Sequence, residues 1–207
     1  KLIFTAFFFL AILFKANSQI SIDNVQEISN LKGATTYIAM KDPNSEKAKE
    51  YVEIFKKYWN LSKFEFIKYS EIDEYLAPGN FFFTIGGYVT NVSSITLFKT
   101  GSKSGLNYSN THIYLELWKA NDKYFEAKKK KDFDDQKHKI QIARIELFTD
   151  FKTLMEPKNL YSSEYDGNGH IRNWGPGILK NYLQSLNSFI NKGEKKSLFS
   201  EIVNTSE

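Results

Sequence analysis

The run Phe81-Phe82-Phe83-Thr84-Ile85-Gly86-Gly87 constrains the fold more than any other part of the chain, because it is the most apolar stretch outside the N-terminus. Pro78-Gly79-Asn80 before it and Gly86-Gly87 at its end are turn signals, so its length favours a strand over a helix. A strand this apolar is typical of burial on both faces, which predicts helices packed over a sheet. No residue in the run is chemically reactive, so it indicates a fold and no activity.

The N-terminal segment has the pattern of a secretory signal peptide. Lys1 precedes an apolar segment from Leu2 to Phe14, and the small residues Ala16 and Ser18 mark a cleavage site before Gln19. A membrane anchor is the alternative, but the apolar segment is shorter than the roughly 20 residues that a spanning helix needs. Only one basic residue and no Met come before the segment, so we expect the natural start to lie just upstream.

The chain has no cysteine. Lipid attachment to an exported bacterial protein needs a Cys at the cleavage point, so this absence excludes a lipoprotein. It also excludes disulfides, Cys-ligated zinc and thiol catalysis. We therefore expect a protein of the periplasm or cell surface, with no membrane span once the leader is removed.

Removing residues 1–18 from the 207 leaves 189, enough for one domain with its own core or for two small ones. A single domain over residues 19–207 is the simpler interpretation. The formal charge falls from +4 to +2 because Lys1 and Lys15 leave, and a nearly neutral chain has no global reason to bind nucleic acid. Residues 198–207 have apolar content and no clear stop, so we expect the chain to continue beyond Glu207.

The first half of the mature chain predicts a βαβ unit. Residues 35–40 and 64–69 are rich in β-formers and read as strands. Between them, Asp42-Pro43 can start a helix whose apolar stripe from Ala48 to Trp59 should face the sheet. Residues 19–32 are interpreted as a lead-in or a short edge element, and residues 70–76 as a short helical turn.

The second half predicts further strands and a final helix. Residues 95–98 are interpreted as the hairpin partner of the central run, joined to it by a link at 88–94, and residues 101–105 as a flexible loop. Residues 113–118 alternate between apolar and polar side chains, which predicts another strand.

Three segments complete the chain. Residues 128–135 are charge-rich and predict a solvated loop. Residues 140–148 fit both a strand and a helix, and their β-branched side chains favour the strand. The stripe from Leu179 to Ile190, opened by Pro176 and closed by Gly193, predicts a helix.

This order of elements indicates an α/β fold, bordering on α+β, in which helices cover a mixed β-sheet. A strand, a helix and a strand followed by a hairpin resembles a thioredoxin-like layout. Where that family places its redox cysteines, at the start of the first helix, this chain has Asp42-Pro43-Asn44-Ser45. The resemblance therefore implies a degenerate binding domain without redox activity.

The composition, rich in Lys, Asn, Ile, Phe and Tyr, together with the Cys-free leader, resembles that of uncharacterised exported proteins of the Bacteroidota. This resemblance covers composition and the leader only. It implies export and assigns no functional residue.

The segment from Glu164 to Gly175 has the highest density of functional residue types. Residues 166–171 are similar to the centre of an EF-hand loop, in which alternate oxygens face a calcium ion, so Asp166 and Asn168 are candidate calcium ligands. Gly175 stands where such a loop needs a bidentate carboxylate, and Arg172 adds positive charge. An ordered Gly/Asn turn with no bound metal is therefore the favoured alternative.

The same segment could contact a ligand. Tyr165, His170, Arg172 and Trp174 combine aromatic faces with hydrogen-bond donors, which suits sugar or peptide recognition. The favoured alternative is that Trp174 pins the segment to the final helix. In a hydrolase, Asp166 and His170 would be acid/base candidates, provided that they and Arg172 point into one cleft.

Other motifs are missing. His112, His138 and His170 share no metal-ligand spacing, and the chain has neither a Gly-x-Ser-x-Gly elbow nor a phosphate loop. Tyr114 and Trp118 fall on the polar side of the strand at 113–118. If they are exposed, they predict a binding surface; the alternative is that a second helix layer covers them.

The leading hypothesis from the sequence is an exported, non-enzymatic interaction or accessory protein with a protein or glycan partner. The alternatives are an exported hydrolase or carbohydrate-active protein with its site on residues 164–175, and the thioredoxin-like binding domain described above.

Overall fold

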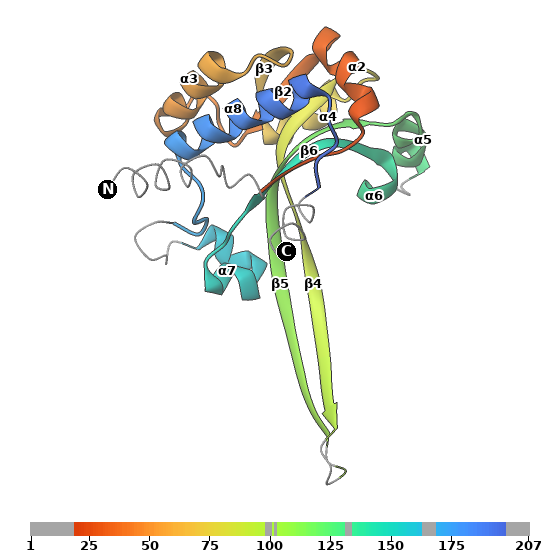
Figure 1. The fold of residues 1–207 in the computed structure, drawn as a ribbon, viewed down its shortest axis with the longest axis vertical. Helices are drawn as coiled ribbons and strands as arrows, with labels where there is room; N and C mark the ends of the chain where they lie inside the picture. The colour runs from red at the N-terminus through yellow and green to blue at the C-terminus, as the bar shows by residue number, and fades with distance from the viewer. Residues whose placement is uncertain (1–18, 98–100, 102, 131–133, 163–168, 198–207) are drawn as a thin grey trace, which may run out of the picture.

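The computed structural model describes residues 19–97, 101, 103–130, 134–162 and 169–197 (Figure 1). The strands are β1 (Ile20–Ile22), β2 (Thr35–Met40), β3 (Lys63–Lys68), β4 (Phe81–Leu97), β5 (Lys103–Ala120) and β6 (Lys139–Leu147). The α-helices are α2 (Ile28–Gly33), α3 (Lys49–Tyr58), α4 (Ile72–Tyr75), α5 (Asp122–Lys130), α6 (Asp135–His138), α7 (Phe151–Met155) and α8 (Pro176–Lys192). Short 3-10 turns are η1 (Val25–Glu27), η2 (Glu46–Ala48), η3 (Tyr69–Glu71) and η4 (Pro157–Tyr161).

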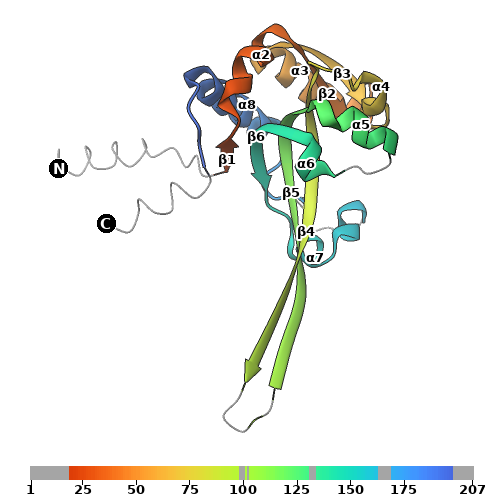
Figure 2. The same ribbon diagram turned by 90° about the vertical axis from the view of Figure 1, so that its right-hand side faces the viewer.

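The six strands form one mixed sheet in the order β1-β6-β5-β4-β2-β3. β2 pairs in parallel with both β3 and β4, whereas β4 with β5, β5 with β6, and β1 with β6 are antiparallel. Helices lie on both sides of the sheet (Figure 2). The predicted α/β class with a mixed, helix-covered sheet is confirmed.

The predicted βαβ unit is also confirmed. β2 begins and ends where the sequence places it, and it pairs with β3 in parallel from Thr35 opposite Lys63 to Met40 opposite Lys68. The intervening helix α3 follows the short η2 turn and buries Phe55. Its apolar stripe packs on the sheet, as helical spacing of apolar residues predicts.

The central run is buried on both faces only as far as Thr84. Phe81 and Phe83 join the main core beneath α2, α3 and α8, while Phe82 joins a second core beneath α4 and α5. Ile85 is 43 % exposed. The prediction of a strand buried on both faces holds for the first four residues and is wrong for the last three, because β2 and the helices end there.

The predicted link at 88–94 and separate partner strand at 95–98 are wrong. β4 is one continuous strand to Leu97 and pairs with β5 along its whole length, from Phe81 opposite Lys119 to Leu97 opposite Lys103. Gly86 and Gly87, which we interpreted as a turn signal, lie inside the strand. A Cβ atom at Gly86 would lie 2.5 Å from Cε2 of Tyr114, and one at Gly87 would lie 2.8 Å from the carbonyl oxygen of His112. Glycine is needed for these close approaches between strands, not for a turn.

The outer part of this hairpin projects far from the body of the molecule (Figures 1 and 2). β2 pairs with β4 only through Phe81 to Phe83, and β6 pairs with β5 only from Ile113 onward. We call residues 84–97 and 103–112 the arm.

Four α-helices were not predicted: α2, α5, α6 and α7. Two of them have a clear cap. α5 occupies the start of the predicted solvated loop at 128–135, and that prediction is wrong for Lys128 to Lys130. The side chain of Asn121 accepts a hydrogen bond from the backbone of Tyr124, which caps the helix, and lysines in the last turn complement its dipole. The second, α7, follows β6 and is capped by Asp150.

The ends of the described chain meet beside β6. β6 confirms the strand favoured at 140–148, and α8 confirms the final helix, ending at Gly193 with φ of 67°. β1 is the predicted short edge element. Ile22 pairs with Lys196 through two backbone hydrogen bonds of 2.8 and 3.0 Å.

Candidate functional site

The sheet face opposite the main core is only partly covered by helices. α4 and α5 pack over Phe82 and Trp118 at one end of it. Beside them lies an open groove with a volume of about 610 Å³. We call its lining residues from the sheet the polar face: Tyr88, Tyr114, Glu116, Lys139, Gln141 and Arg144. A second hollow of about 520 Å³ shares Tyr88, Gln141 and Arg144 and extends toward β1.

Aromatic rings cross the base of the arm on this face. Tyr88 of β4 stands opposite His112 of β5, and their rings stack with centroids 4.6 Å apart. Tyr114 lies two cross-strand pairs closer to the body, opposite Gly86, with its ring centroid 6.2 Å from that of Tyr88. The absence of a side chain at Gly86 lets the ring of Tyr114 lie directly over β4.

Arg144 of β6 binds these rings to the body. Its guanidinium carbon lies 3.9 Å from the ring centroid of Tyr114 and 5.2 Å from that of Tyr88, a cation–π arrangement. Nη2 also donates to the hydroxyl of Tyr88 at 3.4 Å, and Nε pairs with the carboxylate of Glu146. Burial lowers the pKa of Arg144, but the contacts with Tyr88 and Glu146 outweigh burial and raise it above its ordinary value.

A second ion pair completes the polar face. Lys139 donates to Oε1 of Glu116 at 3.0 Å, and its ammonium lies 4.3 Å from the ring centroid of Trp118. The indole of Trp118 donates to the hydroxyl of Thr84, which donates to Glu116. Glu116 is buried, and a buried carboxylate needs a hydrogen-bonding or oppositely charged partner, which Thr84 and Lys139 supply.

The polar face therefore fastens the arm to the body. The acids Glu116 and Glu146 have cationic partners, and Arg144 lies against the rings of Tyr88 and Tyr114. Such a network orders the first pairs of the arm.

Farther out, the described strands of the arm pair only with each other. In an antiparallel pair, successive residues direct their backbone groups alternately to the two sides. The carbonyl of Ile85 accepts from the hydroxyl of Tyr69 at 3.1 Å on the side away from β5. The odd-numbered residues of β4 from Gly87 to Leu97 therefore present their N–H and C=O groups along the outer edge.

The composition of this edge is unusual. Residues 84–97 read TIGGYVTNVSSITL and contain no Asp, Glu, Lys, Arg or Pro. Natural edge strands are commonly protected from pairing by charged side chains, Pro or bulges, and β4 has no charge or Pro here. Ile85, Tyr88 and Val89 of β4 are each 43 to 45 % exposed. The arm thus has the chemistry of a strand edge available for pairing.

The site predicted at residues 164–175 is described only in part. Tyr165, Asp166 and Asn168 lie outside the described residues, so the calcium ligands and the acid/base role of Asp166 stay predictions. Among the residues that the structure describes, no three His, Asp or Glu side chains gather in a way that could hold a metal ion.

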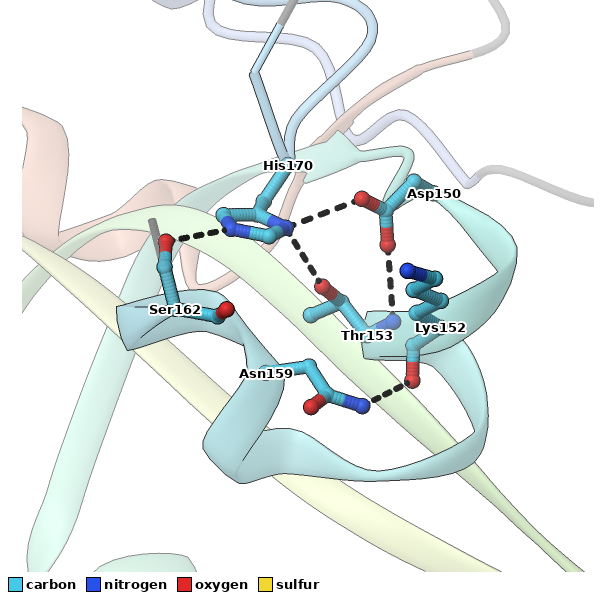
Figure 3. Close-up of polar contacts among 6 residues, drawn as sticks. All are labelled: Asp150, Lys152, Thr153, Asn159, Ser162 and His170. Carbon is cyan, nitrogen blue, oxygen red and sulfur yellow. Dashed lines mark hydrogen bonds and ion pairs between the residues drawn. The ribbon is translucent and has the colours of Figure 1, made fainter. Parts of the chain in front are cut away.

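His170 is buried and bonded to several groups (Figure 3). Nδ1 lies 2.9 Å from Oδ2 of Asp150 and 3.2 Å from the hydroxyl of Thr153, and Nε2 lies 2.8 Å from the carbonyl oxygen of Ser162. Asp150 in turn accepts from the backbone N–H of Thr153 at 2.7 Å, as the cap of α7. The ring thus connects α7, the end of η4 and the segment that leads to α8.

The hydrogen bonds determine how this cluster is charged. A carbonyl oxygen only accepts, so Nε2 of His170 carries a proton toward Ser162. The backbone N–H of Thr153 lowers the pKa of Asp150; burial acts in the opposite sense, and the contacts with the Thr153 side chain and His170 lower it further. Nδ1 lies against Oδ2 of Asp150 and Nε2 against the carbonyl oxygen of Ser162, so protein groups engage both ring nitrogens of His170.

Arg172 and Trp174 do not face the same space as His170. Trp174 stacks on Tyr51 of α3 with centroids 5.4 Å apart, and it packs against the main core, to which α8 also contributes. Arg172 is exposed, and its backbone donates to Phe148 at 2.7 Å. The hydrolase hypothesis, which needs Asp166, His170 and Arg172 in one cleft, gains no support from the described residues.

The two aromatic residues of β5 have different outcomes. Trp118 is 3 % exposed beneath α5, so the alternative of cover by a helix layer applies to it, and the expectation of an exposed surface fails there. Tyr114 is half-buried and lines the polar face. Its role in binding stays a prediction.

Sequence reasoning missed Tyr88, Glu116 and Arg144 as a group. One signal was present: Arg144 lies between Ala143 and Ile145 in a strand, so it must face away from the core that those residues enter. The contact between Arg144 and Tyr88 depends on two strand registers at once, which local patterns do not encode.

None of the helices in the described part of the chain has the length and apolar composition that crossing a bilayer requires. Searches against protein-family models, curated proteins and solved structures find no match to this chain.

Proposed function

We propose that this chain is an exported, non-enzymatic interaction protein of the periplasm or cell surface, which binds a protein partner by strand pairing along the arm. The observation that carries the proposal is the outer edge of β4: its described residues have no strand partner beyond Phe83, and no charged side chain stands between Thr84 and Leu97. Such edges recruit an extended segment of another chain through backbone hydrogen bonds.

The base of the arm supports this function. Isolated two-stranded hairpins are marginally stable in water, so a projecting ribbon needs help to keep its shape. Arg144 and the rings of Tyr88, His112 and Tyr114 supply it at the first pairs outside the body. A pre-ordered edge loses less conformational entropy when a partner binds.

The arm favours a protein partner over a glycan. The edge offers alternating N–H and C=O groups at the spacing of a β-strand, which an extended polypeptide matches residue by residue. A glycan site would need open aromatic faces, and Arg144 lies against those of Tyr88 and Tyr114.

Site-specific photo-crosslinking in producing cells tests the proposal. A photoreactive residue at Val89, on the arm, is expected to give a discrete protein adduct, whereas one at Gln184, exposed on α8, is expected to give none. Equal labelling from both positions, or no adduct from Val89, would contradict arm-mediated binding.

A reporter fusion tests export separately. Residues 1–25, preceded by an initiator Met and fused to alkaline phosphatase, should yield an active enzyme, because that reporter folds only outside the cytosol. N-terminal sequencing of the exported product should begin at Gln19. Replacing Leu10 and Leu13 with Lys is the matched control and should abolish the activity.

A further inference from the structure

We propose that the strand that pairs with the arm is the β4 edge of a second copy of this chain, in an antiparallel, two-fold symmetric arrangement. This inference rests on the proposed function and names its partner. The reasons lie in which edge is open, where pairing must begin, and which residues then face each other.

The β4 edge is better suited to pairing than the β5 edge. Beside β5, helix α7 packs at the base of the arm (Figure 1). The β5 edge also includes Lys103 at its outer end, and lysine on an edge opposes pairing. The β4 edge has neither feature beyond the contact of Tyr69 with Ile85.

Tyr69 sets where pairing begins. Its hydroxyl already bonds the outward carbonyl of Ile85, so the first outward backbone groups open to a partner are those of Gly87. The last in the strand are those of Leu97. An antiparallel copy that uses this whole segment places Gly87 opposite Leu97 of the second copy, and its two-fold axis passes at Val92.

Between residues 89 and 95 this register matches residues of like character. Val89 stands opposite Ile95, Asn91 opposite Ser93, and Thr90 opposite Ser94. Directly opposed residues share a face of a sheet, so apolar residues meet apolar ones, polar residues meet polar ones, and no two charges are brought together. The outward residues would exchange about twelve backbone hydrogen bonds over this length.

The base of the arm has room for the end of the second strand. A hollow of about 310 Å³ lies beside Gly87 and is lined by apolar groups, among them Tyr69, Ile85, Val89, Pro157 and Leu160. The register places Leu97 of the second copy at the position opposite Gly87, next to this hollow. The outer end of each β4 therefore arrives at an apolar surface on the other copy.

The symmetry also limits assembly. When β4 pairs with β4, both copies use the same surface and the complex closes as a dimer. Pairing of β4 with β5 of another copy would leave a new open edge at each end and grow without limit.

Proline substitution at two matched positions tests which edge is used. Asn91 and Ser109 face each other in the hairpin, share one side-chain hydrogen bond, and both direct their N–H groups outward. Proline is tolerated at such positions. Either substitution removes one outward N–H and the shared side-chain hydrogen bond, so the two variants differ in which edge loses its donor. Over about 1 to 100 μM, sedimentation velocity should show a dimer for the wild type and for Ser109→Pro, and a monomer for Asn91→Pro. A wild-type monomer throughout, or a Ser109→Pro variant that alone dissociates, would overturn the proposal.

Disulfide trapping tests the register. The chain has no cysteine, so Val92→Cys would carry the only thiol. On the axis, residue 92 faces its own copy as a non-hydrogen-bonded pair, with Cα atoms about 4.5 Å apart, which a disulfide can span. Under mild oxidation Val92→Cys should form a covalent dimer quickly. Thr90 of one copy faces Ser94 of the other, so Thr90→Cys alone or Ser94→Cys alone should form a covalent dimer much more slowly. A mixture of the Thr90→Cys and Ser94→Cys proteins should form one quickly. Equal rates for all three single variants would contradict this register.

The outcomes separate this inference from the proposed function. A Val89 adduct of twice the chain mass supports the second copy. A Val89 adduct with a different protein, together with a monomeric wild type, refutes the second copy and leaves binding through the arm intact.

Discussion

At the scale of single residues, the buried pair of Asp150 and His170 is the most consequential interaction outside the polar face. Asp150 caps α7 and at the same time bonds to Nδ1 of His170, whose ring connects the segment before α8 to the body. Removing one partner of a buried ion pair leaves the other charge uncompensated, which costs more than the pair itself contributes.

Replacing Asp150 with Asn should therefore destabilise the protein in a pH-dependent way. The folded-state pKa of Asp150 is lowered, so its contribution to stability is present above the unfolded-state pKa of about 3.9 and is lost as the pH falls through the lower folded value. We expect Asp150→Asn to lower the free energy of unfolding by about 2 kcal/mol at pH 7, and by less near pH 3, which lies below the unfolded-state pKa. Urea titrations at both pH values measure this.

Asp73→Asn is the matched control, because Asp73 pairs with Lys128 on the surface with its side chain 71 % exposed. Its effect should be small at either pH. A deficit for Asp150→Asn that stays the same from pH 7 to pH 3 would contradict the assignment.

At the scale of elements, Arg144 joins β6 to the start of the arm, and its loss should loosen the arm without unfolding the body. Arg144→Met keeps most of the aliphatic bulk but removes the cation from the rings of Tyr88 and Tyr114. A loss of about 1.4 kcal/mol would speed local opening tenfold, so amide exchange at Tyr88 and His112 should accelerate by about that factor.

Arg144→Lys is the conservative control for that experiment. Lysine keeps the charge but lacks the planar group that lies over the two rings and pairs with Glu146, so it should restore protection only in part. Exchange at Phe83, inside the core, should stay unchanged in both variants. Equal acceleration at Phe83 would show general destabilisation and contradict a local role.

Elements with one face on the core were predicted well from sequence, and elements without such a face were not. β2, α3, β6 and α8 each carry apolar residues at the period of their own structure, and the predictions for them are confirmed. The arm has no core to face, so its alternation carries no burial signal. The two glycines at 86 and 87 then looked like a turn, although their true cause is the close approach of Tyr114 and His112.

Only those parts of the site that a single residue reveals in its own strand pattern could be predicted from the sequence. The polar side of β5 singled out Tyr114, but the burial of Trp118 depends on α5, which the charged sequence at 128–130 had hidden. The contact of Arg144 with Tyr88 joins residues 56 positions apart. Such long-range contacts follow from strand order and register and cannot be derived from local periodicity.

At the scale of the whole molecule, the arm and the body should behave as separable parts. Replacing residues 91–109 with the dipeptide Asn-Gly would shorten the arm. Thr90 and Asn110 are directly paired, and Asn-Gly suits a two-residue hairpin loop between such a pair. Among the removed residues that the structure describes, none belongs to either core. We expect the free energy of unfolding to change by less than about 1 kcal/mol, because surface changes of this kind cost little.

Trp118→Ala is the contrasting variant, because the same hairpin enters the second core there. Truncating this side chain should cost about 3 to 5 kcal/mol. Chemical denaturation followed by circular dichroism compares the two variants with the wild type. A shortened arm that destabilised the protein as much as Trp118→Ala would contradict the division into arm and body.

The backbone bridge between Ile22 and Lys196 has a practical consequence for handling this molecule. Because β1 and the segment at Lys196 lie side by side, a label or surface tether attached at Gln19 and one attached at Ser197 would emerge near each other. A short peptide could bridge the two ends, and the polypeptide could then be opened elsewhere to give a circularly permuted chain with the same strand order.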